Sequence, residues 1–577
     1  MERSWHIAEV WAGTQETAVK LGISPTIAQV LYNRGISDLE EAKKFLDPKL
    51  NGLTEPDDLP DLLSAAQRIF QAVKEKESIV IYGDYDVDGI AGTAILWHIL
   101  SQAGAKVNFY VPHRIEEGYG LNIQAIKKLV AQGTRLLITV DCGIRDHVAL
   151  ACAREVGLTV IVTDHHEPDL KFPDAFAVIH PSRCAEVGRN IDVNPCGAAV
   201  AFKLAWAVAR EVSGGKRVDD VYRELLVELT ALVALATIAD VVPLKGENRI
   251  LVKFGLERLS HTKLPGLLAL LASANLDDSK LDSYHAGFVL APRLNAAGRM
   301  GHASEALELL IVSDADRAKK LASFLDKQNR ARQKLEERIT REAIELADYQ
   351  GQLVDQMSIL VLAREGWHAG VIGIVASKIV ERFNKPVVMI AINGERGQGS
   401  ARSIAGYDIN QGLTACSEYL TGYGGHAMAA GLRLKSDNIF PFMKALQEHA
   451  GKVLSNATVL PALEIDALAK AEELDANFIW QLKRLGPFGH GNPRPIFATG
   501  KTTLLGEPKI VGSDGKHLTF TIRWDGKIFR AIAFGQAEMR ERLMDDRQCQ
   551  VAFEPILDEY SGGGLIQLRV KSIRAIQ

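Results

Sequence analysis

Cysteine is scarce in this chain, and no two cysteines are spaced as a pair. The 577 residues include six, at positions 142, 152, 184, 196, 416 and 549, without a C-x-x-C motif. This usage is typical of reduced thiols and argues against a disulfide framework or a zinc site. The chain also lacks a run of eighteen apolar residues that could span a membrane, and its polar start lacks the apolar segment of a signal peptide. We therefore expect a cytoplasmic protein with no membrane contact.

A strong excess of one charge is also missing. The net charge is −4, which does not by itself indicate a protein that binds nucleic acid. The balance differs along the chain, because the region from Lys483 to the end holds 15 Lys and Arg against 10 Asp and Glu. This local surplus is compatible with an appended module that binds a polyanion.

What the chain does contain is a regular alternation of strand and helix patterns. The expected strands are residues 79–82, 107–111, 136–140, 159–163 and 176–179. Helical patterns separate them, and this βαβ rhythm predicts a parallel sheet covered by helices. A mainly helical region follows, over residues 195–312.

The length suggests three or four domains, and one segment separates two of them. Residues 314–348 contain no Gly or Pro and predict a helix of about 50 Å at 1.5 Å per residue. Strand and helix patterns resume after it, so we expect a rigid connector between two α/β lobes. Short β-rich runs near the C-terminus predict a small β-barrel or sandwich. The expected units are an N-terminal helical segment (1–75), a catalytic α/β domain (76–313), the connecting helix (314–350), a second α/β domain (351–455) and a C-terminal β domain (456–577).

Three carboxylates follow the first expected strand. Asp84, Asp86 and Asp88 alternate in the stretch Gly-Asp-Tyr-Asp-Val-Asp-Gly. Open α/β sheets bind their ligands at the carboxyl ends of strands. Asp also makes ordinary turns and helix caps, but three repelling charges at this spacing favour a bound divalent cation.

Two further strands end in possible metal ligands. Asp141 follows the strand at 136–140, and Asp164, His165 and His166 follow the strand at 159–163. Imidazole combined with carboxylate suits manganese, iron or zinc better than calcium. Asp240 follows a long apolar helix, and an Asp in such surroundings needs a partner, either a metal ion or backbone N–H groups.

These motifs resemble a known family. GDYDVDG, VDCG, VTDHH and TIADVVPL resemble, in order, the four motifs of the DHH phosphoesterase superfamily. Within it, the chain resembles the RecJ single-stranded-DNA exonucleases. The segments that carry this closer resemblance are 291–299 (APRLNAAGR), 367–373 (WHAGVIG), 424–431 (GGHAMAAG) and 485–493 (LGPFGHGNP).

The resemblance implies a DHH catalytic domain, a DHH-associated domain and a C-terminal OB-fold domain that binds nucleic acid. It also implies two ions, Mn²⁺ or Mg²⁺, with Asp141 or Asp88 as a bridging ligand. The metal-binding positions are Asp86, Asp88, Asp141, His165 and Asp240. Asp84 matches the first acid and is either a ligand or a group that supports one, and His166 matches the histidine that contacts the scissile phosphate. The chain departs from the family at His180, where Asn is more usual, which concerns a local contact only.

The implied activity is a 5′→3′ exonuclease that degrades single-stranded DNA to mononucleotides in repair and recombination. Candidate residues for binding the substrate are Arg114, Tyr119, Arg293, Asn295, Arg299, Ser400, Arg402, Gly425 and His426. Each Arg taken alone would be interpreted as a surface charge. The resemblance also implies a monomer with a single-strand-binding protein and a helicase as partners.

Two alternatives remain open at this point. One is a DHH phosphodiesterase acting on short oligonucleotides or cyclic dinucleotides, and the other is a binding module with an inactive site. The chain length and basic C-terminal region count against the first, and the intact acids count against the second. In the C-terminal region, aromatic residues alternate with cations as in single-strand-binding OB folds, although most of them are expected in the barrel core.

Overall fold

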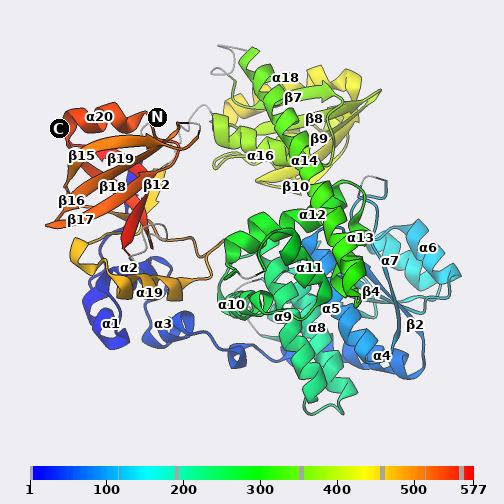
Figure 1. Cartoon of the computed structure of the whole chain (residues 1–577). Coiled ribbons are helices and arrows are strands. Elements are labelled where there is room, and N and C mark those ends of the chain that lie inside the picture. The colour runs from blue at the N-terminus through cyan, green and yellow to red at the C-terminus, as the bar shows by residue number, and fades with distance from the viewer. Residues whose placement is uncertain are drawn as a thin grey trace.

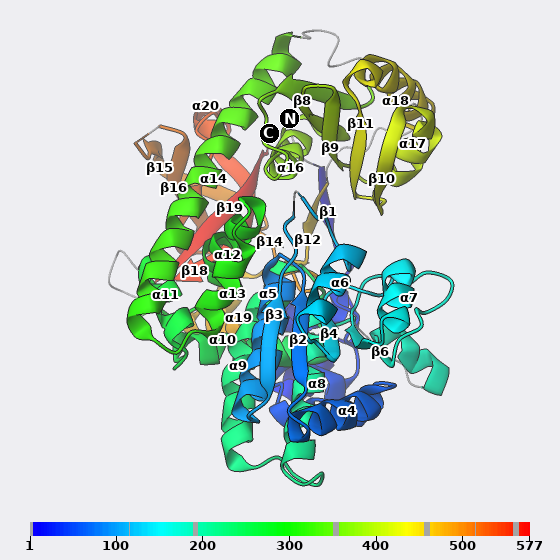
Figure 2. The same ribbon diagram turned by 90° about the vertical axis from the view of Figure 1, so that its right-hand side faces the viewer.

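The chain folds into three units, and a long helix joins the first two. The computed structural model describes residues 4–114, 116–188, 194–277, 279–349, 357–454, 462–513, 515–557 and 565–576. The helix α14 (Ala315–Tyr349) runs from the helices of the first unit to the second unit, while the β-barrel of the third lies to one side (Figures 1 and 2). This arrangement confirms the predicted α/β fold class with a connecting helix and a C-terminal β domain.

The first unit is built on five parallel strands in the order β3-β2-β4-β5-β6. These are β2 (Ser78–Gly83), β3 (Lys106–Tyr110), β4 (Leu136–Val140), β5 (Thr159–Thr163) and β6 (Ala177–Ile179). Two of them have the predicted bounds, and the other three differ by one residue at one or both ends. Both β2 and β4 are almost fully buried, which is why their sequences are continuous apolar runs.

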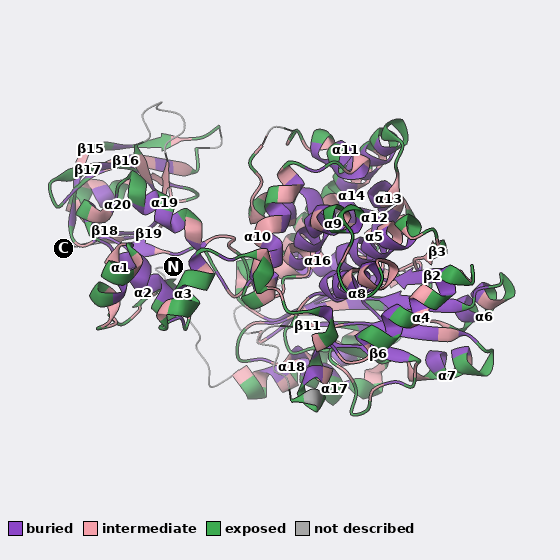
Figure 3. Cartoon of the chain, turned by 90° about the horizontal axis from the view of Figure 1, so that it is seen from below, coloured by how far each residue is buried: buried purple, intermediate pink, exposed green. Residues whose placement is uncertain are grey.

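Helices cover both faces of this sheet, because alternate strand residues point to opposite sides. Ile79 and Ile81 pack with α4, α5 and α8, whereas Val80 and Tyr82 pack with α6 and α7. These helices are α4 (Leu62–Lys74), α5 (Val87–Gln102), α6 (Ile123–Ala131), α7 (His147–Glu155) and α8 (Gly197–Val212). Figure 3 shows α5 as mostly buried, as are the central strands β2 and β4.

A further helical layer follows α8 and is covered in part by α14. Its members are α9 (Asp220–Ala239), α10 (Gly246–Ser260), α11 (Pro265–Ser273), the π-helix η4 (His285–Leu290), α12 (Ala291–Arg299) and α13 (Ala303–Ile311).

The second unit has a mixed sheet in the order β10-β11-β9-β8-β7. Its strands are β7 (Leu360–Glu365), β8 (Val387–Asn393), β9 (Arg396–Arg402), β10 (Leu420–His426) and β11 (Ala429–Lys435), and its helices are α16 (Ile372–Phe383), α17 (Ile409–Ala415) and α18 (Ile439–Leu454). Strand β7 begins at Leu360, which pairs with Val387 of β8. The start of the predicted second α/β domain, residues 351–356, lies outside the described part of the chain.

The third unit contains a closed five-stranded barrel, since β18 pairs with both β15 and β19. The barrel strands are β15 (Thr502–Val511), β16 (His517–Trp524), β17 (Lys527–Ala533), β18 (Gln548–Leu557) and β19 (Ile566–Ala575); short strands β12 (Ala462–Ile465), β13 (Ala467–Leu468) and β14 (Phe497–Ala498) and helices α19 (Ala476–Leu485) and α20 (Met539–Asp546) accompany them. Phe520, Trp524 and Phe529 are buried in its core, as expected for most of these aromatics, whereas Phe534 is about half exposed.

The N-terminal segment is shared between two units. Its first helices pack on the core of the barrel unit, and β1 (Ser4–Ile7) pairs with β12. These helices are α1 (Thr14–Leu21), α2 (Pro25–Asn33) and α3 (Leu39–Leu46). Helix α4 instead belongs to the core of the first unit. Residues 1–75, predicted as one helical segment, therefore contain a strand and contribute to two cores.

Two further properties concern the cysteines and the hydropathy of the helices. All six cysteines lie among the described residues and are free thiols. Within the described ranges, every helix is too short or too polar to cross a lipid bilayer.

Candidate metal centre

Acidic and histidine side chains from four segments meet at the carboxyl edge of the first sheet. Asp84 follows β2, Asp141 follows β4, and His165 and His166 follow β5. Because β2, β4 and β5 are neighbours, the residues after them lie side by side. Asp240, the C-cap of α9, reaches the same place from the helical layer.

His165 lies at the centre of this cluster. Its Nε2 atom is 3.2 Å from Asp141 Oδ1 and 3.6 Å from both Asp88 Oδ2 and Asp240 Oδ2. Burial lowers the pKa of His165, so its imidazole stays neutral and Nε2 keeps a lone pair for a metal ion.

Three sets of donor atoms lie within 4.8 Å of one another: Asp141, His165 and His166; Asp88, His165 and Asp240; and Asp84, Asp86 and Asp141. Three of these donor atoms, Asp84 Oδ1, Asp141 Oδ1 and His165 Nε2, are buried and have no hydrogen-bond partner among the described residues. Leaving buried polar atoms unpaired is unfavourable. A donor set of carboxylates and imidazole, converging and unsatisfied, fits divalent cations such as Mn²⁺ or Mg²⁺.

Two of the acids are held in place by backbone N–H groups. Asp86 caps α5, since its Oδ1 accepts hydrogen bonds from Asp88 N at 2.9 Å and Gly89 N at 3.3 Å. Asp88 uses both oxygens, accepting from Gly197 N at 2.6 Å and Ala198 N at 2.8 Å at the start of α8. Asp86 can therefore cap α5 and bind a metal ion at the same time, because its second oxygen is not used by the cap.

Asp240 differs from these two. No hydrogen bond to its carboxylate comes from a described residue, and His165 Nε2 lies 3.6 Å from its Oδ2. Of the two partners considered for Asp240, a metal ion is favoured over backbone N–H groups.

Close packing leaves no room for larger residues around these acids. A Cβ at Gly197 would lie 2.7 Å from Asp141 Cβ, and one at Gly89 would lie 2.6 Å from the backbone of Asp84. Asp141 itself has φ +63°, a left-handed conformation that Asp and Asn adopt more readily than other side chains. The two glycines and the turn at Asp141 bring the strand ends and helix starts together.

The carboxylates destabilise one another's charge. Burial, then the charge of Asp86, raises the pKa of Asp84 well above its ordinary value. Burial, then the charge of Asp88, does the same to the pKa of Asp141. The pKa of Asp240 rises to about 8, from burial first and then from Asp88 and Asp86. A bound cation would reverse these shifts, because it stabilises the ionised form.

His166 is oriented by a buried acid. Asp164 Oδ1 accepts from His166 Nδ1 at 2.8 Å, and Tyr119 Oη lies 3.0 Å from the same nitrogen. Burial opposes protonation of His166, but the hydrogen bond and charge of Asp164 outweigh it and raise the pKa of His166 to about 9. At neutral pH the ring is therefore an imidazolium with Nε2–H available to donate. The hydroxyl of Tyr119 donates to the backbone carbonyl of Asp141 at 2.9 Å.

The sequence placed Asp164 among the possible metal ligands and did not predict that it would orient His166. Its other oxygen accepts from Ile144 N at 3.0 Å, so the whole carboxylate is occupied by hydrogen bonds. Burial opposes its ionisation, but these bonds, chiefly from His166, hold its pKa below the ordinary value. An acid directly before two histidines looks like a ligand in a sequence, and only the hydrogen bonds distinguish its role. The backbone N–H groups of Gly197 and Ala198, which hold Asp88, were not predicted either, because a sequence motif does not identify backbone hydrogen bonds.

The second unit closes over this edge of the sheet. A pocket of about 150 Å³ is lined by Tyr119 and His166 from the first unit and by His426 at the end of β10. His426 Nδ1 lies 3.9 Å from Glu167 Oε2. Gly425 precedes it at φ +151°, where a Cβ would collide with the carbonyl oxygen of Ala429. The predicted residues Tyr119, Gly425 and His426 are thus brought to one place.

Cationic residues from both units lie near the acids of the metal centre. Arg299 donates from Nη1 to the carbonyl of Gly370 at 3.0 Å, and burial, then Arg114, lowers the pKa of Arg299 to about 10. Arg402 donates to Ser400 Oγ at 3.2 Å, and burial, then Arg114, lowers its pKa too. Arg114 stacks over the Tyr85 ring at 4.7 Å. Mutual repulsion among these cations favours an anion between them.

Two predicted substrate residues have structural partners. Arg293 Nε donates to Asp326 on α14 at 3.1 Å, and Arg293 Nη1 donates to the carbonyl of Val289. Asn295 Oδ1 accepts from Val87 N at 3.1 Å, which fixes the start of α5. In this structure Asn295 supports the acidic loop, residues 84–88, and Arg293 holds α12 against α14.

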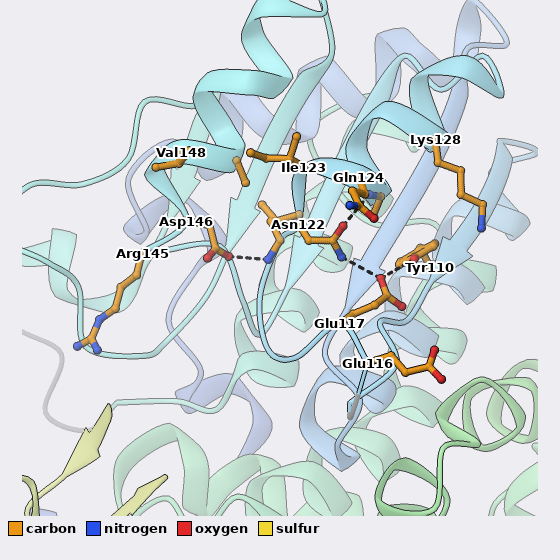
Figure 4. A pocket seen from close by; sticks show the side chains of 13 residues that line it. Tyr110, Glu116, Glu117, Asn122, Ile123, Gln124, Lys128, Arg145, Asp146 and Val148 are labelled. Atoms are coloured by element: carbon orange, nitrogen blue, oxygen red, sulfur yellow. Dashed lines mark hydrogen bonds between the residues drawn. The ribbon is translucent and has the colours of Figure 1, made fainter. Parts of the chain in front are cut away.

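A larger hollow of about 810 Å³ opens outside the pocket, between α6 and α7 (Figure 4). Its polar groups pair with one another. Glu117 accepts from Tyr110 Oη at 2.7 Å and from Asn122 Nδ2 at 2.8 Å, and Asp146 accepts from Leu121 N. Among the described residues that line this hollow, none has a buried polar side-chain atom without a partner, in contrast to the metal centre.

Comparisons with known proteins agree with this geometry. The model of the DHH family, N-terminal domain, matches residues 78–237, the DHHA1 domain matches residues 356–452, and the RecJ OB domain matches residues 465–572. The single-stranded-DNA-specific exonuclease RecJ of Bacillus subtilis is 37% identical over 96% of this chain and 68% of its own length.

Solved structures give the same result. RecJ from Thermus thermophilus in complex with Mn²⁺ superposes with a TM-score of 0.84 at 30% identity, covering 100% of this chain and 80% of that one. The complex of the same protein with Mg²⁺ gives 0.78 at 29% identity, covering 100% and 79%. On the sequence identity, the order of the three domain models and the shared fold, this chain belongs to the RecJ family.

Proposed function

We propose that this protein is a metal-dependent exonuclease that hydrolyses single-stranded DNA in the 5′→3′ direction and releases mononucleotides. The observation that carries the proposal is the set of buried, unsatisfied donor atoms from Asp84, Asp141 and His165. The specificity of the Bacillus subtilis relative for single-stranded DNA supports the substrate. The 5′→3′ polarity follows from the family resemblance.

The ligand set is large enough for two ions. Asp84, Asp86, Asp88, Asp141, His165 and Asp240 would hold them, with Asp141 present in two of the three donor sets and therefore the favoured bridge. Two bound Mn²⁺ or Mg²⁺ ions would supply an activated water and stabilise the leaving 3′ oxygen of the phosphodiester.

The protein's own groups position and stabilise the phosphate. His166, held by Asp164, presents its free Nε2–H toward the pocket shared with His426. A donor placed there stabilises negative charge that develops on a non-bridging oxygen. Arg114, Arg299 and Arg402 would supply positive charge near the acids of the metal centre.

Cellular roles belong to the same proposal. Action in DNA repair and recombination, a cytoplasmic location, a monomeric state, and association with a single-strand-binding protein or a helicase follow from the family resemblance. No described surface has been assigned to such partners.

The decisive experiment uses the full chain with 5′- or 3′-labelled single strands and Mn²⁺. We expect release of labelled mononucleotide from the 5′ end at once and loss of 3′ label only late, with full inhibition by a chelator. Asp141→Asn should abolish release, while Asp174→Asn, which changes an exposed acid, should not. Release that survives chelation, or that begins at the 3′ end, contradicts the proposal.

Substrate length separates this function from the phosphodiesterase alternative. An enzyme for short oligonucleotides or cyclic dinucleotides would cleave a dinucleotide at least as efficiently as a long strand. Removing residues 456–577 is a poor test, because it would expose the core that α1, α2 and α3 share with the barrel. The comparison of substrate lengths therefore uses the intact protein.

A further inference from the structure

We propose that Tyr284 and Phe288 form a stacking platform for the bases of the single strand, beside the metal centre. This inference rests on the proposed function, since it names where the strand is held as it approaches the site. Both side chains are large, apolar and exposed, at 61% and 73% of their surface. Their rings stack on each other, with centroids 5.3 Å apart and planes at 24°.

The platform is rigidly placed relative to the metal centre. Gly287, between the two aromatics, packs against Ile238, where an added Cβ would come within 3.1 Å of the Ile238 side chain. Ile238 is two residues before Asp240, so the turn that carries the aromatics rests on the helix that carries a metal ligand. π-Helical turns of this kind often occur at functional sites.

The same helical segment also contacts the acidic loop. The π-helix η4 continues without a break into α12, where Asn295 accepts from Val87 N. Farther along α12, Gly298 lies so close to the carbonyl of Tyr85 that any Cβ would collide with it. Seven to eleven residues separate the aromatics from Asn295, or about 10–16 Å at helical rise. We therefore expect a dinucleotide bound at the metal centre to be too short to contact the platform.

The third unit adds a cation to this surface. Arg494 Nη2 lies 3.8 Å from Asp282 Oδ2, two residues before Tyr284, and its guanidinium stacks on Phe488 at 4.9 Å. The Arg494 side chain remains 40% exposed. The loop before it is anchored on the first unit, because Leu244 N donates to the carbonyl of His490 at 2.8 Å.

The chemistry of this surface selects single-stranded nucleic acid as its occupant. Exposed stacked rings next to a stacked, accessible guanidinium are the combination that binds bases and phosphates of single strands without reading sequence. An apolar protein segment would use the rings but not Arg494. Val241, directly after Asp240, is also 62% exposed and has φ +59°, a strained conformation for a β-branched residue. Exposed apolar surface and a strained backbone thus also occur directly after Asp240.

The test measures binding and turnover separately. Affinity for a labelled 20-nucleotide oligo(dT) is measured by fluorescence anisotropy in an Asp141→Asn background with Mn²⁺. Turnover is measured in the otherwise native chain with the 20-mer and with a dinucleotide. The variants are Tyr284→Ala with Phe288→Ala, the ring-preserving pair Tyr284→Phe with Phe288→Tyr, and Phe440→Ala as a control at an equally exposed aromatic.

We expect the alanine pair to weaken 20-mer binding about fivefold or more, with a matching rise in KM for the 20-mer. The dinucleotide kcat/KM, the ring-preserving pair and the control should stay at wild-type values. Unchanged 20-mer affinity in a folded alanine pair overturns the platform, as does equal loss for the dinucleotide. If the native chain degrades no strand at all, the proposed function fails, whereas the anisotropy result still decides the platform.

Discussion

Replacing Asp141 by Asn should stabilise the metal-free protein and remove its stabilisation by metal. Asp141 is buried, its Oδ1 has no hydrogen-bond partner, and its pKa is raised by burial and by Asp88. Asn keeps the shape and tolerates the left-handed φ of +63°, so the change removes charge with little strain. An unsatisfied buried acceptor costs about 1–3 kcal/mol, and the charge adds to it.

This free-energy difference corresponds to a change in melting temperature. At about 2–4 °C per kcal/mol for a domain of this size, Asp141→Asn should melt roughly 2–12 °C above the wild type in chelator. With Mn²⁺ at 100 times its Kd, the wild type gains about 2.7 kcal/mol, whereas Asp141→Asn gains little. The order of the two melting temperatures therefore reverses when Mn²⁺ replaces the chelator.

The pH dependence gives a second check. Because the pKa of Asp141 is raised in the folded state, the folded chain holds a proton that the unfolded chain has already lost above about pH 4. Metal-free stability from this group therefore falls as pH rises toward the folded-state pKa. The difference between Asp141→Asn and wild type should be larger at pH 8.5 than at pH 6, measured by calorimetry or thermal fluorescence. The prediction for Asp141 is wrong if Asp141→Asn melts below the wild type in chelator at pH 8.5. It is also wrong if Mn²⁺ stabilises both proteins equally.

Three further outcomes follow from the same geometry. His166→Gln should lower kcat about 10²–10³-fold while the Mn²⁺ affinity from titration calorimetry stays within twofold, and a large loss of metal affinity would count against its role at the phosphate. Gly298→Ala should weaken Mn²⁺ binding, because its Cβ displaces the Tyr85 carbonyl in the acidic loop; unchanged affinity in a folded variant contradicts this. Mn²⁺ binding near pH 7 should release protons, seen as a buffer-dependent calorimetric enthalpy, since the pKa of Asp240 is about 8; a buffer-independent enthalpy contradicts this.

The sheet could be predicted because its central strands are buried on both faces. Strands of this kind are short apolar runs with clear ends, so 136–140 and 159–163 were predicted to the residue. The same ends locate Asp141 and His165, and a parallel sheet brings neighbouring strand ends together. Local pattern was therefore enough for the fold of the first unit and for most of the candidate site.

Partners distant in sequence could not be predicted in this way. The amphipathic helices near the N-terminus show that one face is buried, but not that it packs on a barrel near the opposite end of the chain. Arg293 is cationic beside a family motif, and its pairing with Asp326 depends on how α12 meets α14. Asp164 supports His166 through a geometry that spacing alone does not specify.

We infer that the acids and histidine at the strand ends hold two divalent ions. Crystals of the full chain soaked in Mn²⁺ test it through anomalous scattering collected at the manganese edge. We expect two peaks, both ligated within the group formed by Asp84, Asp86, Asp88, Asp141, His165 and Asp240, and neither present in Asp141→Asn at the same Mn²⁺ concentration. A single peak, or peaks outside this group, would contradict it.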